Sequence, residues 1–131
     1  MKIFSFGRDR GLHIDRYGSD FVISRLARTA DLHVGCVYVD PSGSVGHHPA
    51  STCQLFIVVQ GEGWVQGEDQ RRIAMKTGAA AFWEPGERHG AGTETGMMAL
   101  VVEGDVLGGD PEDIGPMPKG WVQPETDARA R

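Results

Sequence analysis

Two short stretches of the sequence hold most of the side chains that could do chemistry. The first contains His47 and His48, followed by Gln54 at the start of an apolar segment, and the second ends with His89. Imidazole nitrogens and amide oxygens can bind divalent metal ions, and a histidine can also serve as a general base. These side chains therefore indicate a candidate site, provided that the fold brings the two stretches together.

The segments around these stretches have the composition of β-strands. Cys53–Gln60 is apolar on both faces, so both of its faces need apolar neighbours. Nineteen glycines and seven prolines in 131 residues separate the strand-like segments by tight turns. Short strands joined by such turns predict an all-β sandwich or barrel. The other segments that we expect to form strands are Lys2–Phe6, Phe21–Leu26, Asp31–Val39, Gly63–Gly67, Gln70–Ala74, Ala79–Trp83 and Met97–Glu103.

The connections between these strands are also predicted from glycine and polar residues. We expect a turn at Gly61–Gly63, a polar connection over Arg8–Gly18 and a polar loop over Gly90–Gly96. The barrel domain is predicted to span residues 1–107. Residues 108–131 are rich in glycine and proline and cannot form regular ladders, so we expect a loosely ordered tail.

The two stretches carrying the histidines resemble the two motifs of the cupin superfamily of small β-barrels. Gln54 and Gly61 stand at the spacing of that family's Glu-x6-Gly, with a histidine upstream. Gly78, Pro85 and the Gly86-x2-His89 sequence follow its second motif, with the spacing between the proline and the glycine one residue shorter. The resemblance covers about Pro41–Glu103. It implies a single-domain cupin, that is, a double-stranded β-helix or jelly-roll-like barrel.

The resemblance also implies a metal site inside the barrel. In cupins these positions supply histidines and a glutamate to a divalent metal. Here His89 fits the last ligand, Gln54 stands at the glutamate position, and His48 or His47 fits the first histidine. The family's second histidine has no counterpart. The implied cofactor is a divalent transition metal ion: zinc, iron, nickel or manganese.

The same resemblance implies three kinds of function. The first is an enzyme of isomerase, lyase or dioxygenase type that uses the metal on a small polar metabolite. The second is a metal-free cupin in which His48 or His89 acts as a general base, and the third is a module that binds a small ligand without turnover. The sequence leaves open whether the protein is an enzyme, and it assigns no catalytic residue.

Composition narrows the possible partners. The net charge of −5 and the absence of a basic face argue against nucleic acid. No apolar run approaches the ~18 residues that a membrane helix needs, and the N-terminus lacks a signal peptide, so we expect a soluble, cytoplasmic protein without a membrane partner. Cys36 and Cys53 are expected to be buried thiols, with a disulfide left open. One apolar face of Cys53–Gln60 would face the barrel interior and the other a second sheet or a second subunit, so the segment favours a homodimer.

Overall fold

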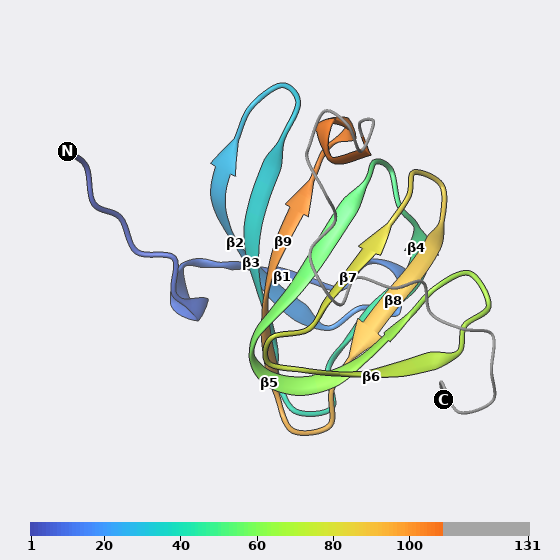
Figure 1. Cartoon of the computed structure of the whole chain (residues 1–131). Coiled ribbons are helices and arrows are strands. Elements are labelled where there is room, and N and C mark those ends of the chain that lie inside the picture. The colour runs from blue at the N-terminus through green and yellow to red at the C-terminus, as the bar shows by residue number, and fades with distance from the viewer. Residues whose placement is uncertain (109–131) are drawn as a thin grey trace.

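The chain folds into a curled, antiparallel β-sheet, as the computed structural model of residues 1–108 shows (Figure 1). The nine strands are hydrogen-bonded in the order β1-β2-β3-β9-β5-β8-β4, and β6 and β7 also pair with β5. The prediction of an all-β fold is confirmed. Nearly all of the predicted tail, from residue 109 onward, lies outside the described residues. The strands are β1 (Leu12–Ile14), β2 (Phe21–Arg28), β3 (His33–Val39), β4 (Ser44–Pro49), β5 (Gln54–Gln66), β6 (Arg72–Lys76), β7 (Ala80–Trp83), β8 (Arg88–Gly92) and β9 (Met97–Glu103).

Strand β5 joins the two halves of the barrel. Its first half pairs with β7 and β9, and its second half pairs with β6 and β8. Gly61 has a φ of +82°, and the ladder with β9 shifts register between Val58 and Gln60, so the strand bends here and continues. The predicted turn at Gly61–Gly63 is therefore wrong. A glycine at a positive φ can also bend a strand and change its direction without ending it.

Three other predictions of local structure are wrong. A segment forms a strand only where another strand is available to pair with it, and the sequence does not show where that is. Lys2–Phe6 forms no strand, whereas Leu12–Ile14, inside the predicted polar connection, pairs with β2. The predicted loop Gly90–Gly96 begins with the last part of β8, which pairs with both β4 and β5. Small residues are required there, because a Cβ on Gly92 would lie 2.3 Å from the ring of Trp64. The remaining predicted strands match observed ones to within a few residues.

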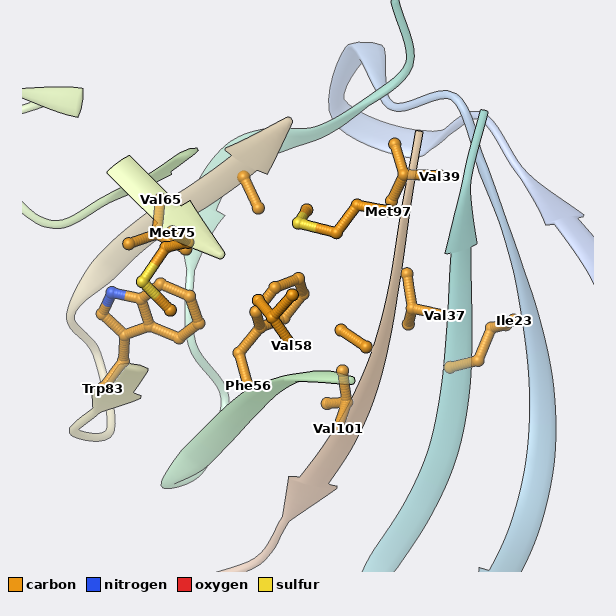
Figure 2. Packing of buried hydrophobic residues seen from close by; sticks show 12 residues of the cluster. Ile23, Val37, Val39, Phe56, Val58, Val65, Met75, Trp83, Met97 and Val101 are labelled. Atoms are coloured by element: carbon orange, nitrogen blue, oxygen red, sulfur yellow. The ribbon is translucent and has the colours of Figure 1, made fainter. Parts of the chain in front are cut away.

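The core lies between the curled walls of the barrel (Figure 2). Alternate residues of the strands face inward, so Phe56 and Val58 of β5 meet Val37 of β3 and Val101 of β9. Both cysteines are free and buried, and burial raises the pKa of both thiols. The structure therefore supports the prediction of reduced thiols. None of the helices within residues 1–108 is long and apolar enough to span a membrane.

Candidate functional site

The antiparallel pair β4–β8 brings two of the predicted site residues together. His48 and His89 are direct Cα partners in this pair, although 40 residues separate them in the sequence. Their ring centroids are 4.4 Å apart, and the ring planes are inclined by 51°. Directly opposed residues of an antiparallel pair place their side chains on the same face, which explains why the rings meet.

An aromatic ring also contacts each of these two imidazoles. The Tyr17 ring stacks on His48 with centroids 4.7 Å apart and an interplanar angle of 5°. The Trp83 indole lies against His89 with centroids 4.6 Å apart. Tyr17 is exposed, whereas Trp83 belongs to the core. The four rings therefore form a continuous row of contacts from the exposed Tyr17 to the buried Trp83.

The hydrogen bonds of His48 define which of its nitrogens is available. His48 Nδ1 lies 2.6 Å from the carbonyl oxygen of Gly46. A carbonyl only accepts, so Nδ1 carries the proton and donates, and Nε2 of the neutral ring keeps its lone pair. A histidine anchored in this way presents Nε2 as a metal ligand or as a general base.

His89 is held in its neutral form. Only 2 % of the residue is exposed, and this burial lowers the pKa of His89 to about 4, with the nearby His48 adding to the shift. Its Nδ1 is buried and has no hydrogen-bond partner within residues 1–108. A buried polar atom without a partner costs free energy, and a bound ligand would relieve that cost.

Gln54 is linked to His89 through Trp83, which pairs with Gln54 and contacts the His89 ring. It opposes Trp83 in the β5–β7 pair and shares the inward face of β5 with Phe56. Since opposed residues share a face, the carboxamide lies beside the indole that touches His89. Gln54 is half-buried, and its placement is compatible with a contribution to the same interior site.

His47 contacts a different part of the barrel. Its Nε2 lies 3.0 Å from the carbonyl oxygen of Gly67, next to the turn between β5 and β6. Neighbouring residues of a strand point to opposite faces, although β4 has a register irregularity between Val45 and His48. The structure thus pairs His48, rather than His47, with His89. A ligand role for His47 stays a prediction.

The donor set decides what kind of metal this site suits. Among the described residues, no three His, Cys, Asp or Glu side chains form a cluster that could hold a metal ion. The donors near one another are the imidazoles of His48 and His89, and Gln54 is the strand partner of Trp83, whose ring contacts His89. Nitrogen-rich, uncharged donors suit zinc, nickel, copper or iron and not magnesium or calcium. If such an ion binds here, the two imidazoles would supply two of its ligands and leave its other coordination positions open.

Sequence reasoning missed two residues that build this site, Tyr17 and Gly46. Tyr17 has a φ of 58°, a left-handed conformation that is strained for a tyrosine. A Cβ on Gly46 would lie 1.8 Å from the Tyr17 carbonyl oxygen, so only glycine lets the Tyr17 turn approach β4 so closely. The adjacent glycine at position 18 was a visible turn signal, but nothing in the sequence indicated the contact with His48.

Replacing Gly46 by alanine is expected to displace this turn. The backbone must move by more than 1 Å to relieve the contact, so we expect a loss of about 2–3 kcal/mol in the free energy of unfolding, measured with urea. Gly7→Ala is the matched control, because its Cβ would meet only the exposed side chains of Asp9 and Ser5 and no backbone atom. It should change stability by less than about 0.5 kcal/mol. Equal stability of Gly46→Ala and wild type would contradict the packing described.

A small antiparallel sheet that curls into a barrel in this way belongs to the jelly-roll class of all-β folds. The family model for the cupin domain matches residues 29–103. The chain belongs to the cupin family. The resemblance seen in the two sequence motifs is thus confirmed at the level of family and fold.

Solved structures agree on the fold. An RmlC-like cupin from Shewanella frigidimarina is 23% identical, with a TM-score of 0.65 over 88% of this chain and 97% of that one. A cupin-like protein from Thermotoga maritima is 19% identical, with a TM-score of 0.67 over 84% and 86%. A predicted oxalate decarboxylase from the same organism is 18% identical, with a TM-score of 0.66 over 76% and 96%. Identities this low show the fold alone, and no curated protein matches this chain.

Proposed function

We propose that the barrel interior at His48 and His89 binds a divalent transition metal ion and, with it, a small polar metabolite. The observation that carries this proposal is the pair of imidazoles 4.4 Å apart on opposed strands. The Gly46 carbonyl leaves the lone pair of the neutral His48 ring on Nε2, and burial keeps His89 neutral. Gln54 would add an oxygen donor from β5.

Such an ion would polarise an oxygen of the metabolite or activate a water molecule. The chain's own residues would position the ligands of the ion and limit the access of water. Tyr17 and Trp83 hold the two imidazoles in place, and the apolar core behind them excludes water from one side of the site. Reactions of isomerase, lyase or dioxygenase type are compatible with this arrangement, and one solved cupin of similar fold is described as a predicted oxalate decarboxylase.

A second candidate function is a metal-free cupin with His48 as a general base. The specific observation in its favour is the anchored Nδ1, which leaves Nε2 free to take a proton. Within residues 1–108, no three His, Cys, Asp or Glu side chains form a cluster that could hold a metal ion, and this also favours the metal-free candidate. Turnover that persists in a chelator and disappears in His48→Ala would support this candidate over the first.

Metal binding is tested on protein purified without an affinity tag or chelator. We expect elemental analysis to find a transition metal, and we expect added nickel or zinc to raise the melting temperature, because a ligand that binds only the folded state stabilises it. At a concentration about 100 times Kd the gain is about 2.7 kcal/mol. His48→Ala should abolish this gain.

His13→Ala is the matched control, because His13 is an exposed histidine that contacts Asp20 outside the site. It should keep the full response to metal. The proposal is contradicted if wild type contains no metal and shows no thermal response, or if His48→Ala responds as wild type does.

A further inference from the structure

The outer face of the sheet carries apolar side chains that the core does not use. Val34 of β3 opposes Val102 of β9, which in turn opposes Leu55 of β5. Two residues further along the same strands, Leu100 opposes Ile57. Opposed residues and residues two apart share a face, so these five side chains lie together. None of them belongs to the core cluster or packs against it, and all five are half-buried. We refer to Val34, Leu55, Ile57, Leu100 and Val102 as the outer patch.

No second layer covers the outer patch within residues 1–108. The described elements form one curled sheet with short 3-10 helices, in which β3, β9 and β5 are neighbours (Figure 1). These three strands contact the strands beside them in that sheet. A contiguous apolar surface across three strands marks an interaction site. The sequence predicted this second apolar face on β5 and favoured a second subunit as its cover.

The chain leaves the sheet beside the outer patch. Gly104 follows β9 directly, and its amide donates a hydrogen bond of 2.9 Å to the carbonyl oxygen of Cys53. Cys53 lies only two residues before Leu55 in the sequence. The short helix η3 (Asp105–Gly108) follows Gly104. Residues 109–131 therefore begin within a few residues of the outer patch.

We infer that residues 109–131 fold back over the outer patch and that Trp121 packs against Leu55 and Val102. Trp121 and Val122 are the only two adjacent large apolar residues of this segment. Trp121 stands 13 residues beyond residue 108. That length corresponds to roughly 40 Å of extended chain, whereas three adjacent strands span only about 10 Å. The segment can therefore reach the whole patch.

Proline determines how this segment can dock. Pro118 and Pro124 flank Trp121 and Val122, and proline cannot donate to a ladder, so the segment docks through side chains and not as a further strand. An indole ring buries about 150–250 Å². The tail that the sequence predicts to be loosely ordered would then be anchored at one point.

The tether favours the chain's own segment over a second copy. A segment linked to its site binds as if it were present at millimolar concentration, far above the concentration of a second copy in dilute solution. The inference is independent of the metal site, since no residue of the outer patch belongs to that site.

The first test locates Trp121 by nuclear magnetic resonance on the full chain. The protein contains three tryptophans, and the signals of the Trp121 ring are those missing in Trp121→Phe. We expect nuclear Overhauser effects between this ring and methyl groups of Leu55 or Val102, because docking brings them into contact. A Trp121 ring without such effects would overturn the inference. Effects that arise only between labelled and unlabelled chains in a mixed sample would place a second copy on the patch and would also overturn it.

The second test measures the protection of the patch. Leu55→Cys introduces a thiol there, and its rate of modification by a maleimide is compared with and without Trp121→Asp. Burial of a large apolar side chain favours the docked state at least about tenfold, so modification should be at least about tenfold faster once Trp121 is replaced. The native thiols of Cys36 and Cys53 are buried and provide the unreactive background.

Ala74→Cys is the matched control. Ala74 is exposed on β6 and lies outside the outer patch, so its thiol should react at the same rate with and without Trp121→Asp. Equal rates for Leu55→Cys in the two backgrounds, or an equal rise at both positions, would overturn the inference. Protection of Leu55→Cys that increases with protein concentration would overturn it as well, because it would identify a second copy as the occupant.

Discussion

Replacing Gly61 by alanine should destabilise the barrel by about 3–4 kcal/mol, the largest effect that we expect of any single methyl group. Gly61 has a φ of +82°, and a Cβ there would lie 2.3 Å from the carbonyl oxygen of Gly96. The left-handed conformation costs about 1–2 kcal/mol for an L-residue, and the clash with backbone costs the remainder. Urea unfolding monitored by tryptophan fluorescence would measure the change.

Gly78→Ala separates the two contributions. Gly78 also has a positive φ, of +95°, but a Cβ there would meet nothing within 4 Å. It should therefore show only the conformational cost of about 1–2 kcal/mol. If Gly61→Ala and Gly78→Ala are equally stable, the bend in β5 does not depend on the close approach to Gly96.

Lowering the pH from 7 to 4 should destabilise the metal-free protein by about 3 kcal/mol through His89 alone. Burial lowers the pKa of His89 from 6.5 in the unfolded chain to about 4 in the folded protein. Between these two values the unfolded chain binds a proton that the folded protein does not bind, so stability increases with pH in this window. The contribution of His89 is complete above about pH 6.5 and is lost as the pH falls towards 4.

The variant His89→Phe tests the origin of this dependence. Phenylalanine cannot take up a proton, so the free energy of unfolding should fall less between pH 6.5 and pH 4 than it does in wild type. Urea unfolding at several pH values would measure both proteins. Equal pH dependence in both would show that the His89 ring is hydrated and not buried against Trp83.

The sequence predicted the fold better than it predicted the site. Segments with strongly apolar alternation, such as Met97–Glu103, became strands with the expected bounds because they have partners on both sides. Lys2–Phe6 has a similar composition and formed no strand, because strand formation depends on an available edge as well as on composition. The bend at Gly61 was mistaken for a turn for a related reason: a glycine pattern does not show whether the ladder continues.

At the site, motif spacing located His48 and His89, and the structure places them on opposed strands. The sequence could not choose between His47 and His48, since the choice depends on the local register of β4. It also could not reveal Tyr17, because the stacking on His48 arises from a left-handed turn far away in sequence. Contacts of this kind depend on tertiary packing, which a local pattern does not contain.

The most direct measurement is a crystal structure of protein soaked with nickel or zinc, with anomalous diffraction recorded at the absorption edge of the metal. We predict an anomalous peak within about 2.0–2.2 Å of Nε2 of His48 and of a nitrogen of His89, the usual distance from such ions to imidazole. Gln54 would be the third residue near the ion. A saturated crystal with no peak between the two rings, or with His48 and His89 turned away from each other, would contradict the proposed metal site.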